Sequence, residues 1–224
     1  MSSRAIIIAI DGPAGAGKST IASRLAKRLG FLYIDTGAMY RAVGLWAMRT
    51  NTALDDMHRL EKLAVESDIV LSGGGTTVLL NGEDISGLIR TQELSDAASK
   101  VSAVPGVRRA LVEKQREMGK RESVVMEGRD IGTNVFPNAQ VKIYLDASAA
   151  VRAARRVKDL AAKGESAVPD VVEREIRERD ERDSTRSEAP LRQAPDAEFI
   201  DTSGLTLEQV EEAILKFYRA RTSN

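Results

Sequence analysis

The feature that most constrains this chain is a glycine-rich stretch close to its start. Residues 12–20 read Gly-Pro-Ala-Gly-Ala-Gly-Lys-Ser-Thr and contain the complete G-x-x-x-x-G-K-[ST] pattern. A short β-branched apolar run over Arg4–Ile10 precedes the pattern, and apolar residues at helical spacing follow it over 19–29. A buried strand, a glycine-rich loop and a helix in this order predict the opening unit of a P-loop α/β fold.

The loop itself predicts a binding site for the phosphates of ATP. Its glycines allow successive backbone N–H groups to point at phosphate oxygens, and the following helix adds the positive end of its dipole. Lys18 can reach the β- and γ-phosphates, and the hydroxyl of Ser19 can ligate Mg²⁺. The residues expected to bind ATP are Gly12, Pro13, Ala14, Gly15, Ala16, Gly17, Lys18, Ser19 and Thr20.

Four later apolar runs, at 31–34, 124–126, 141–145 and 199–200, have the length of buried strands, and each leads to an acidic residue. Helical patterns separate several of them, which predicts a doubly wound parallel sheet of about five strands. The last helix has a capping-box start at Thr206 and Gln209, and its buried stripe would include Leu207 and Phe217. We expect one domain spanning residues 1–224.

The stretch 66–104 interrupts this alternation of strands and helices. Asp68–Ser72 and Thr76–Leu80 have the composition of strands around three consecutive glycines at 73–75, and Asn81-Gly82 is a hairpin-type turn. We interpret the stretch as a small insertion with antiparallel strands followed by helix. The segment 170–186 is almost entirely charged and predicts a helix with i,i+4 ion pairs.

Composition excludes several other classes of function. Lys and Arg together number 33, as do Asp and Glu, so the whole-chain charge favours neither nucleic acid nor a membrane as partner. Without cysteine, and with His58 as the single histidine, the chain offers no disulfide, thiolate or zinc site. The apolar runs are too short to cross a membrane. We expect a cytoplasmic monomer.

Arginines follow the predicted strands and also lie within the charged segment 170–186. A phosphoryl group in transfer requires such cations around it. The planar guanidinium group of arginine can bind phosphate through two parallel hydrogen bonds. The residues in question are Arg41, Arg129, Arg152, Arg155, Arg156, Arg179, Arg182 and Arg186. A kinase for a small acceptor fits this pattern and the chain length. A phosphate acceptor would need no general base, because its second pKa is about 6, whereas a hydroxyl acceptor would need one, with Asp35 as the candidate.

Four other interpretations compete with such a kinase. A GTPase would read guanine through an N-K-x-D motif, which the chain lacks, and motor ATPases are usually larger. A kinase acting on the hydroxyl of another small metabolite remains open. A nucleotide-switched binding module also remains open; it would show little turnover stimulated by an acceptor.

Several longer motifs resemble those of bacterial cytidylate kinases, in the same order and over about residues 5 to 218. They are Ile10–Pro13 with the loop that follows, Asp35–Arg41, Ile89–Glu93, Gly128–Thr133, Lys142–Ala147 and Glu178–Asp183. The resemblance implies a nucleoside-monophosphate kinase fold with an insertion that binds the monophosphate and a mobile lid at about 152–167. It also implies transfer of the γ-phosphoryl group of ATP to CMP or dCMP with Mg²⁺, leaving the preference among CMP, dCMP and UMP open.

The resemblance further implies a role for individual residues. Thr36, Arg41, Arg129 and Arg186 would hold the phosphate of the acceptor. Ser99, Arg108 and Asp130 would read the edge of cytosine, whose amino donor and ring acceptors suit an aspartate, an arginine and a hydroxyl. Arg179 and Asp183 would hold the ribose. The catalytic residues would be Lys18, Arg129, Arg155 and Arg156.

Overall fold

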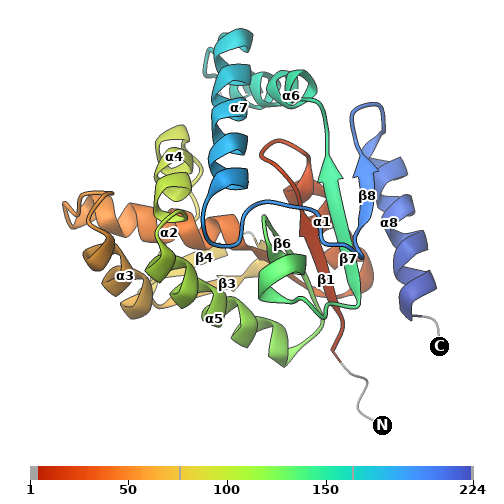
Figure 1. The fold of residues 1–224 in the computed structure, drawn as a ribbon, viewed down its shortest axis with the longest axis horizontal. Helices are drawn as coiled ribbons and strands as arrows, with labels where there is room; N and C mark the ends of the chain where they lie inside the picture. The colour runs from red at the N-terminus through yellow and green to blue at the C-terminus, as the bar shows by residue number, and fades with distance from the viewer. Residues whose placement is uncertain (1–4, 76, 163, 223–224) are drawn as a thin grey trace.

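The computed structural model describes residues 5–75, 77–162 and 164–222, and its centre is a parallel sheet (Figure 1). The five strands, in spatial order, are β2 (Leu32–Asp35), β6 (Val124–Gly128), β1 (Ile7–Asp11), β7 (Val141–Asp146) and β8 (Glu198–Asp201). All neighbouring pairs run parallel. The predicted α/β fold with five parallel strands is therefore confirmed, although Arg4, placed in the first strand, lies outside the described residues.

Helices cover both faces of this sheet, which is why its strands are apolar on both sides. One face carries α1 (Lys18–Leu29) and α8 (Leu207–Thr222), and the other carries α5 (Pro105–Arg121) and the π-helical turn η2 (Ile131–Val135). Side chains alternate accordingly. In β1, Ile8 and Ile10 join the core under α1 and α8, whereas Ala9 joins the core under α5.

A second, antiparallel sheet lies within the predicted insertion. It consists of β3 (Ile69–Ser72), β4 (Thr77–Leu80) and β5 (Glu83–Asp84), with the short turn η1 (Gly73–Gly75) between the first two. Asn81 and Gly82 connect β4 to β5 with φ of 52° and 83°, the positive values of a type I′ hairpin turn. The predicted antiparallel strands are thus present, and Thr76 lies outside the described residues.

The small sheet shares one apolar core with four helices. They are α2 (Thr36–Arg49), α3 (Met57–Glu66), α4 (Gln92–Val101) and α5, of which only α4 lies wholly within the predicted insertion at 66–104. His58 is exposed near the start of α3. Within the described parts of the chain, no helix has the length and apolar composition needed to cross a membrane.

Two helices stand above the carboxyl ends of the parallel strands (Figure 1). They are α6 (Ala149–Ala162), which makes up most of the predicted lid at 152–167, and α7 (Pro169–Thr185), the predicted charged helix. Val172 and Ile176 of α7 pack with Ala153 of α6 in a small apolar cluster. Lys163, inside the predicted lid, lies outside the described residues.

The last helix begins as predicted. The hydroxyl of Thr206 accepts the N–H of Gln209, and the Gln209 side chain accepts the N–H of Thr206. One expectation for this helix is wrong: Leu207 is 41% exposed instead of buried, because the buried stripe starts only at Val210. Phe217 is half-buried.

The turn between β1 and the glycine-rich loop depends on the absence of a side chain at Gly12. At φ 148°, a Cβ there would lie 1.9 Å from the carbonyl oxygen of Leu145 in β7. Gly30, after α1, also has a positive φ of 69°, but nothing lies within 4 Å of its Cβ position.

Gly12→Ala should therefore lower the free energy of unfolding by on the order of 3 kcal/mol or more. Gly30→Ala should cost only about 1 kcal/mol, and urea unfolding of both variants checks the difference; equal costs would contradict it.

Candidate active site

A cavity of about 980 Å³ opens at the carboxyl ends of the parallel strands. The glycine-rich loop and the start of α1 form one side of it, and residues from α2, α4, α6 and α7 form the others. This is where ligands bind in open α/β sheets. The predicted residues that line it are Ala14, Gly15, Ala16, Gly17, Lys18, Ser19, Thr20, Thr36, Arg41, Arg108, Arg129, Asp130, Arg155, Arg156, Arg179, Asp183 and Arg186. The predicted residues that do not line it are Gly12, Pro13, Ser99, Arg152 and Arg182.

Lys18 is held at the floor of the cavity by the loop that precedes it. Its Nζ donates to the carbonyl oxygen of Pro13 at 2.6 Å, and the residue is 5% exposed. Burial lowers the pKa of Lys18, and the neighbouring guanidinium groups of Arg129 and Arg179 lower it further. An anion placed among these groups would stabilise the charged ammonium, so the position of Lys18 suits a phosphate ligand.

Glu127, at the end of β6, is a site residue that our reading of the motifs did not select. Its Oε2 accepts the hydroxyl of Ser19 at 3.0 Å, its Oε1 accepts the hydroxyl of Tyr33, and it is 4% exposed. Burial, followed by the nearby carboxylate of Asp35, raises the pKa of Glu127. The signal was present in the sequence, because Glu127 is one of the acids that end a buried apolar run.

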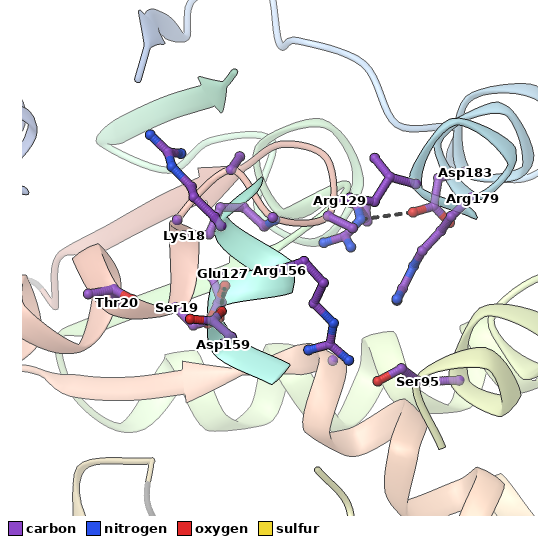
Figure 2. A pocket seen from close by; sticks show the side chains of 18 of the residues that line it. Lys18, Ser19, Thr20, Ser95, Glu127, Arg129, Arg156, Asp159, Arg179 and Asp183 are labelled. Atoms are coloured by element: carbon purple, nitrogen blue, oxygen red, sulfur yellow. Dashed lines mark hydrogen bonds and ion pairs between the residues drawn. The ribbon is translucent and has the colours of Figure 1, made fainter. Parts of the chain in front are cut away.

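Three arginines form a cationic cluster beside Lys18. Arg129 donates to Asp183 at 2.9 Å, as Figure 2 shows, and Arg41 pairs with Asp35 at 2.7 Å. Burial and the neighbouring Arg129 lower the pKa of Arg179 to about 10. Among the described residues, the Nε atoms of Arg41 and Arg179 are buried and have no hydrogen-bond partner. Unsatisfied buried donors beside like charges are what an anionic ligand would stabilise.

A second group of charges lies next to this cluster, at Asp130. Its carboxylate pairs with Arg108 at 2.6 Å and with Arg186 at 3.4 Å, and all three side chains are buried. The Nε of Arg108 is buried without a partner, and its guanidinium carbon lies 5.8 Å from the centre of the Tyr40 ring. The group offers a carboxylate, a free N–H donor and an aromatic face, which together suit a planar polar ligand.

Ser99 contacts a different partner. Its hydroxyl is buried and accepts from Nε of Arg182 at 3.4 Å, outside the cavity lining. Ser102, one turn further along, does line the cavity, and its carbonyl oxygen accepts from Arg108 at 3.2 Å. Arg182 therefore connects α7 to α4. We expected it among the phosphate-binding cations, but it does not line the cavity.

The arginines of α6 have distinct partners. Arg155 donates to the carbonyl oxygen of Thr202 at 2.6 Å, and Arg156 donates to the side chain of Gln92 in α4 at 2.6 Å. Both line the cavity. Arg152 does not, although we placed it among the phosphate-binding cations: it is buried and bonds the carbonyl oxygen of Ala14 at 3.1 Å and Asp180 at 2.6 Å. Arg152 thus connects α7 to the glycine-rich loop.

Comparison with known proteins agrees with this geometry. Residues 8–220 match the family model for cytidylate kinases. A cytidylate kinase from Solibacter usitatus is 57% identical over 223 residues, covering 98% of this chain and 94% of the relative. Another, from Carboxydothermus hydrogenoformans, is 50% identical over 211 residues, covering 93% of this chain and 95% of the relative.

Among solved structures, an uncharacterized protein from Eubacterium ventriosum is similar in fold, with a TM-score of 0.55 at 13% identity. The match covers 96% of this chain and 99% of that protein. The match of the family model over nearly the whole chain, together with relatives at this level of identity, shows that the chain belongs to the cytidylate kinase family.

Proposed function

We propose that this protein transfers the γ-phosphoryl group of ATP to CMP or dCMP, which yields ADP and CDP or dCDP. The proposal rests on family membership and on one structural observation, which is the set of groups that the cavity brings together. One cavity contains the glycine-rich loop, the arginine cluster and the Asp130–Arg108 pair, in surroundings that suit a triphosphate, a monophosphate and a planar base.

The glycine-rich loop is the proposed donor site. Gly12 and Pro13 shape the loop, Ala14–Thr20 face the cavity, and Lys18 binds the β- and γ-phosphates. The hydroxyl of Ser19 and the carboxylate beside it are the hard oxygen groups that Mg²⁺ prefers, and this ion needs only one or two protein groups when phosphates and waters complete its shell. When bound, Mg²⁺ neutralises charge that develops on the phosphates.

The proposed site for the phosphate of the acceptor combines two arginines of the cationic cluster with Arg186 from the neighbouring group at Asp130. Arg41, Arg129 and Arg186 line the cavity with Thr36, whose hydroxyl is anchored to the carbonyl oxygen of Glu127 at 2.7 Å. A monophosphate dianion would supply the missing acceptors for buried guanidinium donors and reduce the repulsion within the cluster. Arg179 and Asp183, in α7, are the proposed ribose contacts.

The pair formed by Asp130 and Arg108 is the proposed reader of cytosine. Asp130 can accept from the exocyclic amino group, and the unpartnered Nε of Arg108 can donate to a ring acceptor. Uracil presents a carbonyl oxygen where cytosine has its amino group, and this oxygen would face the Asp130 carboxylate. Ser99 would join the base through a rotation of its side chain, because its hydroxyl faces Arg182 in this structure.

The proposed chemistry needs positioning and charge more than a general base. An oxygen of the acceptor phosphate, largely deprotonated at neutral pH, attacks the γ-phosphorus; the new P–O bond forms as the bond to the β-phosphate oxygen breaks, and its electron pair stays on ADP. Lys18 and Arg129 stabilise the charge spread over the transferring group. Arg155 and Arg156 would join them by exchanging Thr202 and Gln92 for phosphate oxygens. We propose a cytoplasmic location, since both substrates are intracellular metabolites, and a monomeric state.

An assay of ADP release across nucleoside monophosphates tests the proposal. CMP and dCMP should stimulate release strongly, UMP much less and AMP almost not at all. Equal rates with CMP, UMP and AMP would contradict the assignment of cytosine. Rates that no nucleoside monophosphate stimulates would favour a hydroxyl acceptor or a nucleotide-switched binding module.

Asp130→Asn tests the reading of the base. The substitution keeps the shape of the side chain but replaces one carboxylate acceptor with a donor, so kcat/KM for CMP should fall on the order of a hundredfold. The ratio of kcat/KM for CMP to that for UMP should fall with it. The affinity for ATP serves as internal control and should stay within about twofold. A loss of ATP binding or of folding would show that Asp130 has a structural role.

Lys18→Met tests the donor site. Removing the ammonium should lower kcat by roughly a hundredfold or more, because its charge acts on the transferring group. Lys27→Met is the matched control, since Lys27 is exposed in the last turn of the same helix and should leave kcat unchanged. Urea unfolding should show both variants folded, and an active Lys18→Met enzyme would refute the role of Lys18.

A further inference from the structure

One contact near the proposed metal site involves a side chain outside the cavity. The hydroxyl of Tyr33 donates to Oε1 of Glu127, while Oε2 of the same carboxylate accepts the hydroxyl of Ser19. Tyr33 lies in β2, is 6% exposed and does not line the cavity. It therefore reaches no nucleotide, and any effect it has on the reaction must pass through Glu127 or through Ser19, whose side chain also lies close to the Tyr33 hydroxyl.

The ring of Tyr33 is held in place by the small antiparallel sheet. The turn η1 packs against β2, and a Cβ at Gly75 would lie 2.1 Å from Cδ1 of this ring. Gly75 has φ +82°, and its neighbour Gly74 has φ +66° with nothing within 4 Å of its Cβ position. The glycines at 73–75 thus have a role that the sequence pattern did not indicate: the last of them leaves space for an aromatic ring.

Glu127 needs such a restraint because of what surrounds it. A glutamate side chain has three rotatable bonds, and a buried carboxylate oxygen without a partner is costly, so a free oxygen would turn toward the nearest donor or cation. Lys18 is close enough to attract Glu127. If Glu127 turned toward Lys18, its carboxylate would leave the hydroxyl of Ser19, and the proposed Mg²⁺ site would lose one of its two oxygen groups.

We propose that Tyr33 is a positioning residue: its hydroxyl holds Glu127 so that the second carboxylate oxygen stays on Ser19, and it thereby sets how strongly Mg²⁺ promotes nucleotide binding. The absence of a side chain at Gly75 contributes to this positioning, because it leaves room for the ring of Tyr33 to reach Glu127. The inference rests on the proposed binding of Mg·ATP at Ser19, and it is independent of which base the acceptor carries.

Tyr33→Phe removes the hydroxyl and keeps the ring. Calorimetric titration with ATP, in EDTA and at a series of Mg²⁺ concentrations, separates metal-dependent from metal-free binding. The gain in ATP affinity on adding Mg²⁺ should fall roughly tenfold, which corresponds to one hydrogen bond to a charged acceptor, while affinity in EDTA stays unchanged. Tyr218→Phe is the matched control, because Tyr218 packs on Phe31 away from the cavity.

Gly75→Ala and Gly74→Ala form a second matched pair, which introduces no change into the cavity. Both place a side chain at positive φ, so both carry similar backbone strain, but only the first displaces the Tyr33 ring. Gly75→Ala should reproduce the reduced gain from Mg²⁺, and Gly74→Ala should bind as the wild type does. Unfolding measured by circular dichroism shows whether each variant is folded at the titration temperature.

The outcomes distinguish this inference from the proposed function. A wild type whose ATP affinity does not respond to Mg²⁺ would overturn the metal site and with it the role of Tyr33. A wild type that responds, with folded Tyr33→Phe and Gly75→Ala variants that respond equally, would overturn the role of Tyr33 and leave the kinase intact. The same holds if Tyr33→Phe loses affinity equally in EDTA and in Mg²⁺.

Discussion

The organisation of this protein depends on how it balances the charges that it buries at one end of a parallel sheet. Lys18, Arg108, Asp130 and Asp183 are each no more than 5% exposed, in surroundings where an unpaired charge would be strongly destabilising. Pairing stabilises most of this set, as between Arg108 and Asp130. It remains incomplete, because guanidinium donors of Arg41, Arg108 and Arg179 have no partner among the described residues. A phosphorylated ligand would complete the pairing, so the groups left unpaired on burial would favour binding of an anion.

This charge network is assembled from two cores. The large sheet presents the glycine-rich loop and the acids that follow its strands, whereas α2 and α5, packed on the small sheet, contribute Arg41 and Arg108. Contacts between the two units therefore lie at the cavity and beside it. Arg156 bonds Gln92 across the cavity, and the ring of Tyr33 lies between the glycine turn of the small sheet and the carboxylate of Glu127.

The parts of the fold that could be predicted are those in which neighbouring residues specify their own structure. The loop pattern, the positions of the strands along the chain, the Asn81-Gly82 turn and the capping box of α8 depend on local backbone preferences, and each appears in the structure. The errors concern which way a side chain faces. Leu207 is exposed, Arg152 binds the carbonyl of Ala14, and Arg182 meets Ser99, since these positions are decided by elements far away in the chain.

The sequence by itself determined that a phosphate-binding loop follows a buried strand, that the sheet is parallel, and that the motifs resemble those of cytidylate kinases, because such information lies in short stretches of residues. Only the tertiary structure decided that the carboxylate of Glu127 accepts the hydroxyls of both Ser19 and Tyr33. It also decided that Arg152 bonds the glycine-rich loop instead of facing the cavity. The reason is physical: the partner of a buried polar group is chosen by packing between distant segments, and no local pattern records which donor and acceptor will be enclosed together.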